Sequence, residues 1–168
     1  SNREELVGEF KQFVRLMIET GANLNKADNT GWTPLYKAVK YSNIGIVRML
    51  IDAGANVNKA EKNGSTPLSI ASRYGHKEIA KMLIDAGADL NKTDNIGMTI
   101  LHWASHNGQK EIVRMLIDAG VNVNKVDSNG WVPLYLILVE HDYHSRKEII
   151  RLLIEAGTDV YKVSNSGE

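Results

Sequence analysis

RMLIDAGANVNK, at residues 48–59, returns as RMLIDAGVNVNK at residues 114–125 with one letter changed in twelve. The two copies start 66 residues apart, which is twice the 33-residue interval that recurs along the chain. Self-similarity at a fixed period of this kind indicates an array of small structural repeats, each a single supersecondary unit.

Two sets of glycines fix the register of the array. Gly31, Gly64, Gly97 and Gly130 follow one another at a constant interval of 33. The second set is Gly21, Gly54, Gly87 and Gly120 at the same interval, followed by Gly157 after an interval of 37. We therefore divide the single domain 1–168 into a partial repeat 1–27, full repeats 28–60, 61–93, 94–126 and 127–163, and a stub 164–168.

Each repeat is expected to contain two short helices followed by a turn. In the repeat 61–93, Thr66 supplies a capping hydroxyl and Pro67 suits the first helical position. Gly75 then interrupts the pattern before a second apolar helical stretch, and Gly87 stands where a left-handed residue ends that helix. The Asn- and Asp-rich segment that follows predicts a tight turn or short hairpin reaching the next repeat.

These motifs resemble the ankyrin repeat. The resemblance rests on GANVN, then D-x-x-G-x-TPL, then a glycine and EIV-x-x-LI-x-AG, and it covers nearly the whole chain. It implies an all-α solenoid of stacked antiparallel helix pairs with projecting hairpins, about five repeats including the partial N-terminal one, and a concave groove. One helix pair cannot bury its own apolar face, so neighbouring repeats must cover it.

Several positions depart from the repeat pattern. Ser42 stands where Gly75 and Gly108 stand, and Gly45 replaces a glutamate inside the second helix of its repeat. Val132 replaces the capping threonine. The four extra residues of the last repeat fall within residues 138–145, where we expect a longer turn between the helices.

The N-terminal segment carries one apolar helix preceded by Gly8. Residues 4–7, before that glycine, are expected to be a remnant of the first helix of the partial repeat. Polar and charged residues around them suit a capping repeat, because the ends of a solenoid need a polar outer face. The alternative is that the chain is a piece of a longer array.

Composition narrows the range of functions. The chain has 20 Lys and Arg against 20 Asp and Glu, so the basic excess typical of nucleic-acid binding is missing. It has no cysteine, and no apolar run approaches the roughly 20 residues of a membrane span. We expect an intracellular protein, cytoplasmic or nuclear, that is monomeric and neither binds nucleic acid nor inserts into a membrane.

Catalytic and cofactor motifs are missing from the sequence, so we predict no enzyme activity, no cofactor and no metal. His102 and His106 lie four residues apart, but His102 occupies the histidine position of the repeat motif. There the resemblance implies a structural hydrogen bond to Thr99. His141 and His144 flank Asp142 in the insertion, where a third ligand is lacking.

Asparagines that follow the second helices allow two interpretations. Asn58, Asn91 and Asn124 each have a leucine eight positions earlier. This pattern resembles the acceptor site of the asparaginyl hydroxylase that modifies ankyrin repeats in animals. The competing interpretation is that these side chains bridge backbone groups of the hairpins, as every repeat requires.

The binding surface is predicted from the positions that the repeat motif leaves variable. By the resemblance, these are the hairpin tip and the exposed end of the first helix. They hold residue types that dominate binding hot spots or have no folding reason to be exposed. The predicted partner-binding residues are Trp32, Lys40, Tyr41, Arg73, Tyr74, Ile96, Met98, His106 and Trp131. Trp103, by contrast, is assigned to the core, because it aligns with Ile70 and Leu136 on the apolar helix face.

The leading function is a non-catalytic interaction module that binds a protein or peptide in the concave groove. A second class is a targeting or regulatory segment of a larger enzyme, channel or bacterial effector. A third is an engineered repeat binder, against which irregularities such as Ser42 and Val132 argue. The fold alone does not identify the partner.

Overall fold

The computed structural model describes residues 2–139 and 143–161, and every regular element within those ranges is an α-helix. The fold class is therefore the predicted all-α class. The helices are α1 Arg3–Glu19, α2 Pro34–Lys40, α3 Ile44–Asp52, α4 Pro67–Tyr74, α5 Lys77–Asp85, α6 Ile100–His106, α7 Lys110–Asp118, α8 Pro133–Val139 and α9 Tyr143–Glu155.

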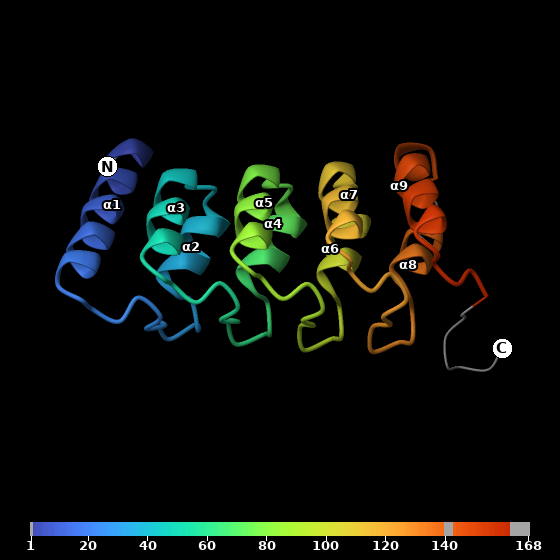
Figure 1. Ribbon diagram of the computed structural model, residues 1–168, viewed down its shortest axis with the longest axis horizontal. Helices are drawn as coiled ribbons and strands as arrows, with labels where there is room; N and C mark the ends of the chain where they lie inside the picture. The colour runs from blue at the N-terminus through green and yellow to red at the C-terminus, as the bar shows by residue number, and fades with distance from the viewer. Residues whose placement is uncertain (1, 140–142, 162–168) are drawn as a thin grey trace.

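From α2 to α9 the helices form a row of antiparallel pairs, and α1 stands beside α3 at the N-terminal end of the row (Figure 1). The first helix of each pair, α2, α4, α6 or α8, packs on the first helices beside it, and the second helices α1, α3, α5, α7 and α9 form the other layer. The connecting turns project together from one edge of the row. This arrangement is the stacked solenoid that the repeat period predicts.

A continuous apolar core runs along the row because equivalent leucines are buried in each repeat. The first helices contribute Leu35, Leu68, Leu101 and Leu134, which are 0–3% exposed. The second helices contribute Leu50, Leu83, Leu116 and Leu153, each 0% exposed. Burying such a leucine contributes about 1.5–3 kcal/mol, which holds each repeat to its neighbours rather than to itself.

Threonine caps start three of the first helices. The Oγ1 atom of Thr33 accepts the backbone N–H of Tyr36 at 3.1 Å, and Thr66 accepts that of Ser69 at 3.2 Å. Thr99 makes the same bond although Ile100 follows it in place of proline. The cap therefore positions the helix start with or without the proline.

The turn between the two helices of a repeat requires a left-handed residue. Gly75 and Gly108 adopt φ of 76° and 71° there. Ser42 occupies the same turn with φ of 57°, and it is the one non-glycine residue with positive φ in the described part of the chain. The first full repeat therefore carries backbone strain that the next two avoid.

Two expectations about the ends of the array were wrong. Residues 4–7 are not a separate remnant of a first helix, because α1 runs from Arg3 to Glu19 without a break at Gly8. A single helix lets the backbone of those residues bond internally. In the last repeat, α9 has 13 residues where α3, α5 and α7 have nine, so the insertion adds helix rather than only turn.

Candidate protein-binding groove

An acidic residue organises each projecting turn. Oδ1 of Asp94 accepts the backbone N–H groups of Ile96 at 3.1 Å and Met98 at 2.9 Å. The side chains at the equivalent positions, Asp28, Glu61 and Asp127, accept the same pair of amides in their own turns. The turns are thus held in one shape, with their tips beside the ends of the first helices.

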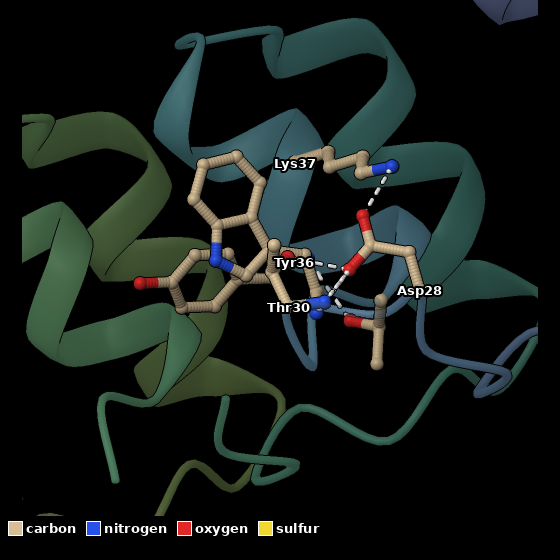
Figure 2. A network of polar contacts seen from close by, with 6 residues as sticks. Asp28, Thr30, Tyr36 and Lys37 are labelled. Atoms are coloured by element: carbon tan, nitrogen blue, oxygen red, sulfur yellow. Dashed lines mark hydrogen bonds and ion pairs between the residues drawn. The ribbon is translucent and has the colours of Figure 1, made fainter. Parts of the chain in front are cut away.

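Asp28 shows the arrangement most fully (Figure 2). Its Oδ2 lies 2.8 Å from Nζ of Lys37, while its Oδ1 accepts the hydroxyl and the backbone N–H of Thr30. The hydrogen bond from Lys37, followed by that from Thr30, holds the pKa of the Asp28 carboxyl well below its usual range. The first turn is thereby tied to α2.

His102 ties the third full repeat to the fourth. Its Nδ1 accepts the N–H of Thr99 at 3.1 Å, and its Nε2 lies 2.9 Å from the carbonyl oxygen of Trp131. The neutral ring with a proton on Nε2 satisfies both contacts. Burial lowers the pKa of His102, which favours that neutral form. The structural hydrogen bond expected between His102 and Thr99 is confirmed.

The repeated asparagines bridge neighbouring turns. Oδ1 of Asn58 accepts the backbone N–H of Asp89 at 2.7 Å, and Nδ2 donates to the carbonyl of Gly87. Asn91 and Asn124 also accept a backbone N–H from the next repeat. Their bridging role is confirmed, whereas their hydroxylation stays a prediction.

An open hollow of about 400 Å³, which we call the groove, lies between the ends of the first helices and the turns. Its walls come from α2, α4, α6 and three successive turns. The lining residues are Trp32, Tyr36, Lys40, Glu61, Asn63, Ser65, Ile70, Arg73, Tyr74, Asp94, Asn95, Ile96 and Trp103. It therefore crosses the boundaries between three consecutive repeats.

Cations lie over indole rings in the groove. The guanidinium carbon of Arg73 is 4.4 Å from the ring centre of Trp103, whose Nε1 donates to Oδ2 of Asp94 at 2.9 Å. Nζ of Lys40 is 4.5 Å from the ring centre of Trp32. Such contacts contribute about 0.5–1 kcal/mol at exposed sites and hold long side chains in place.

Comparison with known families agrees with this geometry. The family model for ankyrin repeats in three copies matches residues 7–94 and 83–164. The chain belongs to the ankyrin-repeat family. Ankyrin repeats generally mediate protein–protein interactions and are typically non-catalytic modules. The search of curated proteins gave no match to this chain.

The ankyrin array gathers five of the nine predicted partner-binding residues around the groove: Trp32, Lys40, Arg73, Tyr74 and Ile96. Tyr74 is 50% exposed and Ile96 is 59% exposed. The indole of Trp32 is half-buried, with its ring 5.5 Å from that of Tyr36.

The other four predicted residues lie elsewhere. Tyr41 is exposed but lines a separate apolar hollow between α1 and α2. Trp131 is half-buried against Tyr135, with ring centres 5.2 Å apart, and His106 is half-buried against Trp103.

The fourth of these residues is Met98, and the expectation that it is exposed was wrong. Met98 is 7% exposed, whereas Trp32, whose backbone makes the same two bonds to Asp28, is half-buried. The turns are bonded alike, so the side chain makes the difference: a bulky indole is rarely fully covered, whereas the narrower methionine is.

Trp103 was assigned to the core, and this assignment was also wrong. The ring is half-buried and lines the groove, although Ile70 at the equivalent position is 4% exposed. An indole N–H needs an acceptor, and Asp94, nine residues earlier, supplies one at the edge of the groove. That need for an acceptor was the signal in the sequence that could have placed Trp103 there.

Neither a metal cluster nor a membrane-spanning helix is found in the described part of the ankyrin domain. Both ring nitrogens of His102 already face Thr99 and Trp131, so the ring has no free position for a metal. His141 lies outside the described residues, and so does the side chain of His144.

Proposed function

We propose that this ankyrin domain is a non-catalytic protein-binding module whose groove holds a segment of a protein partner. The observation that carries the proposal is the exposure of Tyr74 and Ile96 beside the groove. Neither side chain belongs to the apolar core, and together they offer an aromatic and an aliphatic contact next to Arg73. Tyrosine and arginine are among the residues that contribute most to binding hot spots.

The outer layer of the same repeats has a different character, which supports the choice of face. Exposed positions on α5 and α7 are largely charged, and several of them form ion pairs. Lys81 pairs with Asp85 at 2.9 Å, and Lys110 pairs with Glu148 at 2.8 Å. Pairs of this kind are solvated and contribute about 0–1 kcal/mol, so they give a partner little apolar area to bury.

The shape of the groove favours a polypeptide over a small metabolite. It is open, and its lining comes from three repeats and their three turns. A small-molecule site usually encloses most of its ligand, whereas a chain segment can cross several repeats and contact each in turn. The fixed turns and capped helices present these contacts without rearrangement, which lowers the entropic cost of binding.

The test is quantitative capture of partners from a lysate of the source cells. Tyr74→Ala with Ile96→Ala removes the two exposed groove contacts, and Lys81→Ala is the matched control on the outer layer. Groove partners should be reduced about 30-fold with the double variant, as expected for a loss of ~2 kcal/mol, and unchanged with the control. Circular dichroism should show that all three chains keep their helices.

Equal capture by the wild type and the groove variant would refute the proposal. Loss of capture only with Lys81→Ala would instead place the working surface on the outer layer. The proposal also says that the domain is non-catalytic. Steady-state turnover of a substrate by the purified wild type, retained in the double variant, would contradict that statement.

A further inference from the structure

We propose that the groove takes an extended, acidic segment whose carboxylates are about three residues apart. This inference rests on the proposed function and adds the chemistry of the partner to it. It derives from two cations, Lys40 and Arg73, which occupy equivalent places in successive repeats.

Both cations are held in place by aromatic rings. Across residues 2–139 and 143–161, neither Nζ of Lys40 nor the guanidinium of Arg73 lies within 4.0 Å of a carboxylate oxygen. Each instead lies over an indole ring, at 4.5 Å for Lys40 and 4.4 Å for Arg73. The ring orders the side chain while its charge remains available to a ligand.

The acidic side chains in the groove are already occupied. Oδ1 of Asp94 accepts two backbone amides, and Oδ2 accepts the indole N–H of Trp103. Glu61 is 9% exposed, and its Oε1 accepts the amides of Asn63 and Ser65. The two carboxylates thus hold the turns in place through hydrogen bonds, whereas Arg73 is exposed at the end of its helix.

Stability of the helices does not require this arrangement. Cations in the last turn of α2 and α4 stabilise the helix by interacting with its dipole, wherever their side chains point. Placing Arg73 over Trp103 of the next repeat adds nothing to that effect. It does place the charge beside Tyr74 and Ile96, the contacts assigned to the partner.

The repeat spacing sets the spacing of the ligand's charges. Packed helices lie about 8–10 Å apart, and an extended segment in the polyproline II conformation advances about 3.1 Å per residue with three residues per turn, so its side chains at i and i+3 lie on the same face. One repeat therefore corresponds to about three residues of an extended segment. Carboxylates at positions i and i+3 would face Arg73 and Lys40, while the residues next to the carboxylate at Arg73, on the side of the following repeat, contact Tyr74 and Ile96.

The experiment selects binders for the purified chain from a displayed random library of 12-residue peptides. Enriched sequences should contain Asp or Glu at i and i+3 more often than at i+1 or i+2. Binding of the most enriched synthetic peptide should weaken about fivefold with Arg73→Gln or Lys40→Gln, which corresponds to ~1 kcal/mol each. Lys81→Gln, which removes the same charge from the outer layer, should leave binding unchanged.

The outcomes separate this inference from the proposed function. One outcome is that the enriched peptides lack acidic residues but no longer bind the chain that carries Tyr74→Ala and Ile96→Ala. This outcome overturns the inference of an acidic ligand and supports the groove as the binding site. Acidic peptides that bind Arg73→Gln, Lys40→Gln and Lys81→Gln equally also overturn that inference. A selection that yields no peptide dependent on Tyr74 or Ile96 overturns both.

Discussion

Replacing Ser42 by glycine should stabilise the first full repeat. Ser42 has φ of 57°, and the left-handed region costs a residue with a Cβ about 1–2 kcal/mol. Its side chain is exposed, so little packing is lost. Because glycine also gives the unfolded chain more freedom, we expect a net gain of about 1 kcal/mol.

A second substitution in the same repeat should add to this gain. Gly45 is the second residue of α3 and exposed, and a Cβ built on it meets no atom within 4 Å. Gly45→Ala should stabilise the helix by about 0.5–1 kcal/mol. Together the two changes amount to roughly 1.5–2 kcal/mol, or a rise of about 3–8 °C in Tm for a chain of this size.

Hydrogen exchange measures the effect where it acts. In the wild type, amides of α2 and α3 should exchange faster than those of α4 and α5, because repeats open locally and the strained one opens first. The double variant should slow exchange in α2 and α3 by about tenfold or more, following the free energy gained. Urea unfolding followed by circular dichroism gives the global value.

Gly108→Ser is the matched reverse change. Gly108 occupies the same turn two repeats later with φ of 71°, and a Cβ there also meets nothing within 4 Å. Gly108→Ser should lower the free energy of unfolding by ~1 kcal/mol, which is the amount that Ser42→Gly should add. The reasoning is refuted if α2 and α3 are protected as well as α4 and α5 in the wild type, or if Ser42→Gly fails to stabilise while Gly108→Ser costs nothing.

Three further predictions follow from single contacts. The pKa of His102 is lowered on folding, so as the pH falls the unfolded chain binds the proton before the folded chain does. The free energy of unfolding should therefore rise as the pH increases through the ordinary histidine range. In urea titrations, His102→Gln should reduce this dependence on pH. The pKa of Asp28 is also lowered on folding, so its contribution to stability should be lost as the pH falls below the ordinary carboxyl range. When stability is measured against falling pH, Lys37→Met should diminish this loss more than Thr30→Val does. The reverse order would contradict Lys37 as the dominant partner of Asp28. Trp103→Phe keeps a ring beneath Arg73 but removes the hydrogen bond to Asp94, and it should cost about 1 kcal/mol in thermal unfolding; an unchanged Tm would argue against that role.

The ankyrin fold could be predicted from the sequence because its signals are local and repeated. Thr66 and Pro67 define a helix start, and Gly75 defines the turn that follows, without reference to distant residues. The fixed repeat period then requires neighbouring units to share one core, since each unit has an apolar face that it cannot cover alone. The link between His102 and Thr99 was predictable for the same reason, because the two residues are three positions apart in one helix start.

Placement in the groove depended on contacts that the repeat motif does not specify. Trp103 aligns with the buried Ile70, yet Asp94 and Arg73 hold its indole at the edge of the groove. Met98 aligns with the half-buried Trp32 in a turn bonded in the same way, yet it is buried. The motif specifies the position of a side chain along the backbone, but its exposure depends on the neighbours that the fold supplies.

The sequence by itself therefore determined the period, the helix starts and turns, and the family of this chain, since short-range capping and a periodic apolar face suffice for them. Only the tertiary structure decided which side chains form the groove, that α1 is one helix, and that the insertion lengthens α9. The physical reason is that the exposure of a side chain depends on how the repeats stack, and the contact of Arg73 with Trp103 forms between repeats, although that of Lys40 with Trp32 lies within one. Arg73 and Trp103 belong to successive repeats and meet only when those two repeats stack.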